Sequence, residues 1–183
     1  LKPGYNLQVS TNNQYITHYS IHQATTDTTT LKEHLTDFKT EYQTMPAVVT
    51  ADAGYGSEEN YAYLEQNNIT AYVKHSQFDR EQNENLQSKK PFSADKLYYN
   101  QEQDYYVCPM GQHMENSGSY NKKTAAGFIQ TITQYESKNC NGCPLNGTCH
   151  KSKGNRVIEI NHGLNKLKQQ ANERLLSEEG IKK

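Results

Sequence analysis

The order of patterned segments predicts an α/β fold in which a mixed β-sheet is covered by helices. Two segments with strand-like alternation come first. A helix-like segment, a short apolar run, a second helix-like segment and another apolar run then follow. Strands that alternate with helices are typical of sheets with helices packed on their faces. A cysteine-containing part comes later in the chain, so we expect the fold to carry a small β-rich insertion.

The first expected elements are a hairpin and a helix. Residues 5–11 (YNLQVST) and 15–22 (YITHYSIH) are rich in aromatic and β-branched residues, and Asn12-Asn13 between them favours a tight turn. Asp27 is expected to cap the helix that follows, and Met45-Pro46 ends it. The apolar positions of this helix recur at helical spacing, at Leu31, Leu35, Phe38 and Tyr42.

Residues 47–60 (AVVTADAGYGSEEN) join a buried strand to a second helix. The apolar run ends at Asp52, a glycine-containing turn follows, and Ser57 is a natural N-cap. A carboxylate at the carboxyl end of a buried strand is well placed to hold a cation, but Asp52 can equally be a turn-forming residue. We expect Asn67-Asn68 to stop the helix before a strand at residues 69–74.

The second half of the chain begins with a polar segment. Residues 77–91 hold almost no apolar anchor, so we expect a surface linker there. Further strands are expected at residues 96–100, 105–107, 127–135 and 156–160, and a last helix at 164–176. The predicted division of the chain is a first part of the core at 1–76, a linker at 77–95, a β-rich insertion at 96–155, and a returning strand and helix of the core at 156–183.

Composition limits the classes of function. The chain has 183 residues, of which 33% are hydrophobic, and its mean hydropathy is −1.00, so its core must be modest. No apolar run is long enough to span a membrane and the first residues show no signal-peptide pattern, so we expect a soluble, cytoplasmic piece of a longer protein. The net charge of −1 gives by itself no case for a nucleic-acid partner.

The four cysteines all lie in the second half, at Cys108, Cys140, Cys143 and Cys149. Cys140-x2-Cys143 has the spacing that lets two thiolates bind one tetrahedral ion, so the four sulfurs predict a closed, structural zinc site. His113 or His150 could replace one thiolate. Two alternatives remain, namely a pair of disulfides, which needs an oxidising compartment, and unliganded thiols in a small core.

Several segments, taken in order, resemble the DDE-type transposases of bacterial insertion sequences. They are GYNLQVST, ATTDTTTL, ADAGYGSEENYAYLEQNNITAYVK, DYYVCPMG and CNGCPLNGTC. The resemblance implies an RNase H-like mixed sheet with flanking helices, and the cysteine segment, similar to a zinc ribbon, is the insertion. It also implies three acidic residues that hold two divalent ions, Mg²⁺ or Mn²⁺, for in-line attack on a DNA phosphate. Asp52 matches the second of these acids.

The resemblance also indicates which catalytic residues this sequence lacks. The family's first acid lies on a strand upstream of the GYNLQ segment. The third is a glutamate within a sequence motif that does not occur in this chain. The available substitutes for that glutamate are Glu173, Glu178 and Glu179. Asp27 matches a recurrent family position and could support the metals. We therefore expect a fragment, inactive alone, of a homo-oligomeric enzyme that catalyses metal-dependent DNA cleavage and strand transfer.

Contacts with DNA phosphate are expected from few residues. Lys74, His75 and Arg156 are the candidates, with further lysines at 122, 123, 151 and 153 that could also serve only for solubility. The alternative to a fragment of an enzyme is a non-catalytic, zinc-ribbon-like module that binds nucleic acid or protein, or a decayed transposase remnant. In that alternative Asp52 is only a turn residue.

Overall fold

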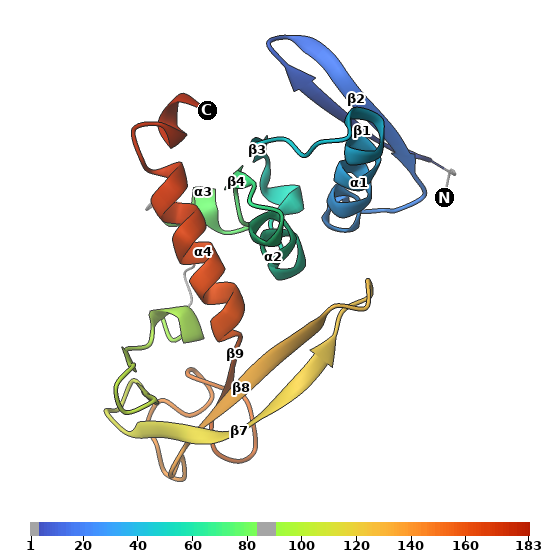
Figure 1. Ribbon diagram of the computed structural model, residues 1–183. Coiled ribbons are helices and arrows are strands. Elements are labelled where there is room, and N and C mark those ends of the chain that lie inside the picture. Colours follow the sequence, from blue (N-terminus) through green and yellow to red (C-terminus); the bar gives the residue numbers. More distant parts are fainter. Residues whose placement is uncertain (1–3, 84–90) are drawn as a thin grey trace. The chain divides into compact units, whose positions relative to one another are not determined.

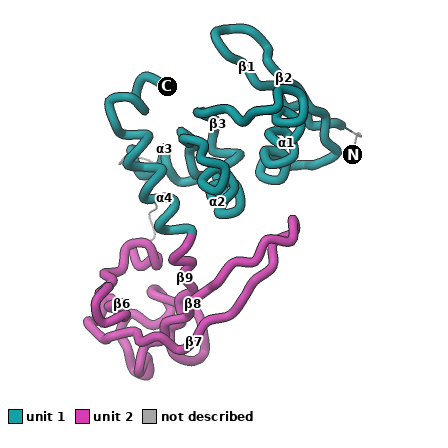
Figure 2. Tube along the Cα trace, viewed as in Figure 1, with its two compact units in different colours: residues 1–84, 164–183 teal, residues 85–163 magenta. Residues whose placement is uncertain are grey.

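The computed structural model describes residues 4–83 and 91–183, and the chain divides into two compact units (Figures 1 and 2). The first unit contains residues 1–84 and 164–183, and the second contains residues 85–163. Each unit has its own hydrophobic core. Helices and sheets are both present, which confirms the predicted α/β class. Within the described residues, no helix is long and apolar enough to span a bilayer.

In its described residues, the first unit contains two pairs of strands and four helices. Its strands are β1 (Asn6–Asn12), β2 (Tyr15–His22), β3 (Val48–Ala51) and β4 (Thr70–Val73). Its helices are α1 (Leu31–Tyr42), α2 (Glu58–Gln66), α3 (Phe78–Gln82) and, from residue 164, α4 (His162–Leu175); the short 3-10 turns are η1 (Asp27–Thr29), η2 (Ala53–Tyr55) and η5 (Gly180–Lys182). β1 pairs antiparallel with β2, and β3 pairs parallel with β4 (Figure 1).

Local sequence explains most of these elements. The β1–β2 turn uses positive φ angles at Asn13 and Gln14, next to the predicted Asn12-Asn13 turn. Ser57 caps α2 as predicted, because its side chain accepts a hydrogen bond of 3.2 Å from the backbone N–H of Asn60. Asn68 has a φ of +54° and ends α2 just before β4. The second helix and its flanking parallel strands are therefore built as the sequence predicts.

The core of the first unit joins helices to the parallel strand pair. Its buried residues come from α1, α2, β4 and α4, and they are Leu31, Leu35, Tyr61, Leu64, Ile69, Ala71, Val73 and Ala171. Ala171 brings the end of the chain into the same core as the first helix. Helix α4 is therefore a structural part of this unit, although the second unit separates it in sequence.

Two expectations for the first unit are wrong. The strands do not form one mixed sheet, because among the described residues β1–β2 and β3–β4 remain separate two-stranded sheets. Asp27 does not cap α1, because Thr30 holds the N-cap position. Asp27 instead begins η1, and its carboxylate binds side chains of β1.

The second unit is built on a five-stranded antiparallel sheet, in the order β5-β6-β7-β8-β9. The strands are β5 (Tyr99–Asn100), β6 (Tyr105–Val107), β7 (His113–Lys123), β8 (Ile129–Ser137) and β9 (Val157–Ile160), preceded by the turn η4 (Ala94–Lys96). Strand β7 is the longest and lies outside the sequence-based expectations, because its sequence HMENSGSYNKK shows no apolar alternation and Met114 is its one buried residue. The predicted linker at 77–95 contains α3 with buried Phe78, and residues 84–90 lie outside the described residues.

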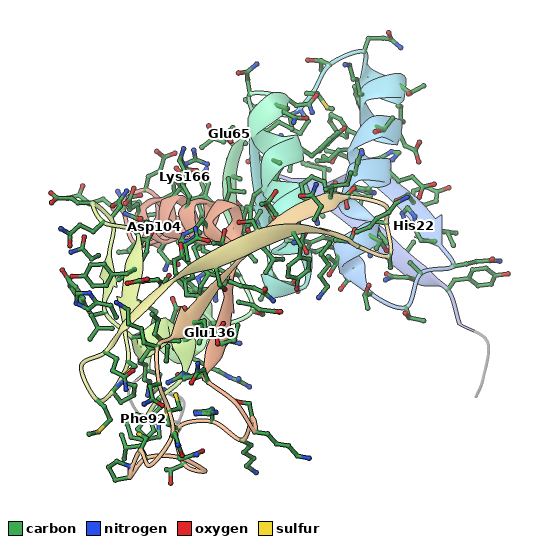
Figure 3. All side chains as sticks on the ribbon, turned by 90° about the horizontal axis from the view of Figure 1, so that it is seen from below. His22, Glu65, Phe92, Asp104, Glu136 and Lys166 are labelled. Atoms are coloured by element: carbon green, nitrogen blue, oxygen red, sulfur yellow. The ribbon has the colours of Figure 1, made fainter. Side chains whose placement is uncertain are left out.

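Asp104 anchors one end of the second sheet; it is labelled in Figure 3. Its Oδ1 accepts hydrogen bonds from the hydroxyls of Tyr99 (2.8 Å) and Tyr135 (2.5 Å), and its Oδ2 accepts one from Asn116 Nδ2 (2.9 Å). The bonds from Asn116 and Tyr135 lower the pKa of Asp104. Burial, and then the bond to Asp104, raise the pKa of Tyr135. The buried hydroxyl of Tyr135 is therefore held in its protonated, donating form.

Candidate catalytic site

Asp52 lies directly after β3, at the carboxyl end of the strand, as predicted. Its side chain is exposed, and its Oδ1 accepts a hydrogen bond of 2.8 Å from the backbone N–H of Gly54, which makes Asp52 the N-cap of η2. The turn-forming role is thus present. It leaves a solvent-facing carboxylate at a strand end, where such a group can also bind a cation.

Asp27 comes to the same loop from η1. Its Oδ1 accepts hydrogen bonds from Asn6 Nδ2 (2.8 Å) and Gln8 Nε2 (3.1 Å), both on β1. The hydroxyl of Thr28 next to it donates to the carbonyl of Gly54 over 2.9 Å, so the turns η1 and η2 are directly bonded. Two segments far apart in sequence are therefore locked together around two carboxylates.

The carboxylates of Asp27 and Asp52 both lie close to Gly54. A Cβ at this position would lie 3.0 Å from Asp27 Oδ2 and 3.0 Å from Asp52 Oδ1. Any larger residue would therefore crowd both acids at once. Glycine at position 54 keeps the space between them open for an ion or for solvent.

Tyr55 and Gln8 complete this cluster, and sequence reasoning missed both as site residues. The hydroxyl of Tyr55 donates a hydrogen bond to Gln8 Oε1, while the amide nitrogen of Gln8 binds Asp27. Burial, followed by the nearby charges of Asp27 and Asp52, raises the pKa of Tyr55. The signal for these residues lay in the segments GYNLQ and ADAGY themselves, which contain Gln8 and Tyr55.

The segment after β4 packs closely against this loop. A Cβ at Gly56 would lie 2.3 Å from the carbonyl oxygen of Lys74 and 2.8 Å from the Cα of His75. The Lys74 ammonium pairs with Asp79 at 2.9 Å. His75 is 1% exposed and lies 2.9 Å from Asn172 Oδ1. The expected phosphate contacts of Lys74 and His75 stay predictions, and His75 also ties α4 to this end of the unit.

A groove of about 530 Å³ lies beside the acidic loop. Residues 8–12 of β1 and residues 46–51, which include β3, line it, together with His34 and Phe38 of α1 and with Tyr55. Among the described residues, β1 pairs with β2 alone and β3 with β4 alone. The groove is therefore bordered by two strands that each have one unpaired edge.

The four cysteines line one pocket of the second unit, together with Ser137, His150 and Arg156. All four are free thiols, and Cys108 and Cys140 are buried. Arg156, which is 5% exposed, donates from Nη1 to Cys149 Sγ (2.9 Å) and from its backbone N–H to Cys140 Sγ (3.4 Å). Its second guanidinium nitrogen donates to the carbonyl of Phe92, a residue labelled in Figure 3. The expected phosphate contact of Arg156 stays a prediction.

The remaining candidates lie apart from these clusters. His113 stacks on Tyr105, with ring centroids 3.8 Å apart, and is not among the residues that line the cysteine pocket. Glu173, Glu178 and Glu179 are exposed on or after α4. Over the residues that the structure describes, no group of three or more His, Cys, Asp or Glu side chains is arranged to hold a metal ion.

Comparison with models of known protein families gave a match to part of the chain. Residues 107–183 match the model of a family described as transposase DDE domain, and these residues include the four cysteines and α4. Comparisons with curated proteins and with solved structures gave no match. Residues 107–183 are therefore similar to a transposase DDE domain, and over these residues the match confirms the resemblance to DDE-type transposases. Asp27 and Asp52 lie outside the matched residues.

Proposed function

We propose that the chain is part of the catalytic core of a DDE-type transposase, with Asp52 as one of the acids that bind the catalytic divalent ions. The observation that carries this proposal is the pair of carboxylates at Gly54, next to a groove with two open strand edges. Carboxylate oxygens are the ligands that Mg²⁺ and Mn²⁺ prefer. Asp27 is the supporting acid, oriented by Asn6 and Gln8.

The groove supports an RNase H-like arrangement. An additional strand between β1 and β3 would join the two strand pairs into one sheet, because each bordering strand has an unpaired edge there. The resemblance puts the family's first acid on a strand upstream of β1. A strand placed in this groove would run alongside β3, whose carboxyl end carries Asp52. It could therefore bring the family's first acid close to Asp52.

The chemistry proposed for this site is phosphoryl transfer on DNA, for which Mg²⁺ or Mn²⁺, when bound, would supply activation of the attacking oxygen and stabilisation of the phosphate charge. The residues of this chain would bind and orient. Asp52 supplies a carboxylate, Asp27 a second one, and the Tyr55–Gln8 pair fixes the position of Asp27. Asp52 and Asp27 supply two carboxylates, and the proposed metal site needs further acidic ligands. We therefore propose that the chain alone does not catalyse DNA strand transfer. The complete enzyme is proposed to act on DNA as a cytoplasmic homo-oligomer.

The experiment compares this chain with the longer protein of which we propose it to be a part. Purified with Mg²⁺ or Mn²⁺ and an oligonucleotide that carries the element's end, the longer protein should cleave and join DNA, and the present chain should not. Asp52→Asn should lower the activity of the longer protein by at least 100-fold. Asp95→Asn, an exposed acid of η4, is the matched control and should leave it unchanged. Full activity of the Asp52→Asn protein would exclude this proposal.

The cysteine pocket supports a second, structural proposal, a zinc ion held by Cys108, Cys140, Cys143 and Cys149. The support for it is chemical, because four free thiols line one pocket and a closed zinc site uses four such ligands, although among the described residues these sulfurs are not arranged as a metal site. The buried guanidinium of Arg156 at Cys149 would balance the negative charge of thiolate ligands. The Oγ of Ser137 lines the same pocket and has no hydrogen-bond partner among the described residues. His150, which also lines it, is the alternative fourth ligand.

A non-catalytic binding module is the second candidate function. The hydrogen bond from Gly54 to Asp52 favours it, because this bond alone explains an aspartate at the start of η2. The two candidates differ in what Asp52→Asn does. A turn residue is replaced by asparagine with little effect, whereas a metal-binding carboxylate is not.

A further inference from the structure

Strands β7 and β8 extend past their neighbours in the second sheet as a two-stranded ribbon (Figure 1). Strand β6 pairs with β7 at residues 113–115, and β9 pairs with β8 at residues 133–136. Among the described residues, 116–132 therefore pair in the sheet only with residues of β7 and β8, and with neither β6 nor β9. We call residues 116–132 the ribbon.

The ribbon carries positive charge and no acidic residue. Its sequence, NSGSYNKKTAAGFIQTI, contains Lys122 and Lys123 near the turn and neither Asp nor Glu, in a chain whose net charge is −1. The acids at its base are engaged. Glu115 pairs with Lys138 at 2.7 Å, and Glu159 accepts a hydrogen bond of 3.2 Å from Gln134. After burial, the carboxylate of Glu159 also raises the pKa of Tyr120 in the ribbon. The acids therefore act at the base of the ribbon, and its turn end presents two lysines to an anionic partner.

One face of the ribbon presents hydrogen-bonding side chains to solvent. Ser119 donates to Thr133, and Thr131 donates to Asn121, each over 3.2 Å, in cross-strand pairs. These contacts bury little apolar surface, and an isolated two-stranded ribbon is marginally stable in water. The exposed polar face therefore contributes little to the fold that carries it.

The ribbon is also protected against pairing with a strand of another protein. A register shift between Asn116 and Gly118 marks a bulge in β7, and Gly118 has a φ of +134°. A bulge and lysines on an edge strand are devices that discourage strand addition. They do not hinder binding to a polyanion.

We propose that the ribbon binds duplex DNA by lying in its major groove, with Lys122 and Lys123 on the phosphates. The proposal rests on the proposed transposase function, which requires DNA as a partner. The major groove, about 12 Å wide, admits a two-stranded β-ribbon. Hydroxyl and amide groups, such as those of Ser119, Asn121 and Thr131, are of the kind that contact base edges there. Lysines at the turn supply the salt-dependent part of the affinity.

The test measures binding of the whole chain to a fluorescent 30-base-pair duplex by anisotropy, over a series of NaCl concentrations. In Lys122→Ala/Lys123→Ala, the loss of two phosphate contacts should reduce the slope of log Kd against log salt by about 1.8, and weaken binding by tens of fold near 0.1 M salt. The matched control, Lys182→Ala/Lys183→Ala, removes two exposed lysines outside the ribbon that have no proposed role in DNA binding, and it should change the slope far less. Thermal unfolding of each variant checks that the fold is kept.

Three outcomes would overturn the proposal. They are an unchanged slope in the ribbon variant, an equal change in both double variants, and no binding of duplex DNA by the chain at low salt. A conservative Lys122→Arg/Lys123→Arg variant keeps the charge and should bind as the wild type does, so its failure to bind would also count against phosphate contacts. None of these results bears on Asp52, whose role is tested separately by strand transfer.

Discussion

The carboxylates of Asp27 and Asp52 approach one point in the structure, the position that a Cβ of residue 54 would occupy. The two residues come from different turns, η1 and η2, and Thr28 binds these turns together through the carbonyl of Gly54. Their proximity is thus a property of the fold and not of the local sequence. The two acids should therefore respond together to any change at Gly54.

Gly54→Ala is expected to separate the two carboxylates. Its Cβ would meet both oxygens at 3.0 Å, and side-chain oxygens can move aside at a modest cost. In the longer protein proposed above we expect at least about a tenfold loss of strand transfer, with an unfolding free energy lowered by about 1 kcal/mol or less. Gly154→Ala, where a Cβ meets nothing within 4 Å, is the control for both measurements. Wild-type activity in Gly54→Ala would show that the open space between the acids is not used.

Gly56→Ala should instead damage the fold. A Cβ there would lie 2.3 Å from the backbone oxygen of Lys74, which cannot move aside as a flexible side chain can. We expect a loss of about 2 kcal/mol or more in the free energy of unfolding measured with urea. Gly154→Ala again serves as the control. A stability equal to wild type would mean that η2 and the segment after β4 do not pack as described.

His34 should make the first unit sensitive to mild acid. Burial, with the nearby rings of His18 and His22, lowers the pKa of His34 to about 4, against an opposing effect of Asp37. Between pH 6.5 and 4 the unfolded chain therefore binds more protons at this residue than the folded chain does. The free energy of unfolding decreases as the pH is lowered, by up to about 1.4 kcal/mol per pH unit. Urea unfolding at pH 7.5, 6.0 and 5.0 measures this dependence. In His34→Gln the curve should be flatter, and an unchanged curve would assign the effect to other groups.

Tyr135→Phe tests the Asp104 anchor of the second unit. The substitution removes a buried hydroxyl that donates to Asp104 and lies 2.7 Å from His162 Nε2. We expect a loss of about 1–3 kcal/mol in unfolding free energy. Tyr98→Phe changes a side chain that is 65% exposed and should be neutral. Equal effects of the two substitutions would contradict the anchoring role of Asp104.

The zinc proposal predicts about one zinc ion per chain after purification under reducing conditions without chelator. Elemental analysis gives the stoichiometry, and a thiol reagent gives the number of reactive cysteines. Cys140→Ser should lose the metal, whereas His113→Ala, outside the pocket, should keep it. Four freely reactive thiols in a folded, zinc-free chain would remove the proposal.

Local patterns predicted much of the first unit and less of the second. The hairpin turn, the Ser57 cap and the stop at Asn68 each depend on neighbouring residues; all three are found, the turn one residue later than predicted, at Asn13 and Gln14. Strand β7 could not be predicted, because its exposed polar residues follow no apolar period. The neighbours of Asp27 could not be predicted from the sequence either, because Asn6, Gln8 and Gly54 are brought close to Asp27 only by the tertiary structure. The position of Asp52 at a strand end is the part of the candidate site that the sequence alone predicted.

The groove between β1 and β3 has a practical consequence for handling the protein. Among the described residues, β1 and β3 each have one edge without a partner strand, and such edges are a template for strands of neighbouring molecules. The exposed side chains of Val9 and Val48, which line the groove, add an apolar attraction. Self-association through this groove would grow with protein concentration and temperature. Dilute, cold samples therefore suit work on this chain, and light scattering against concentration is the appropriate quality check before any binding or stability measurement.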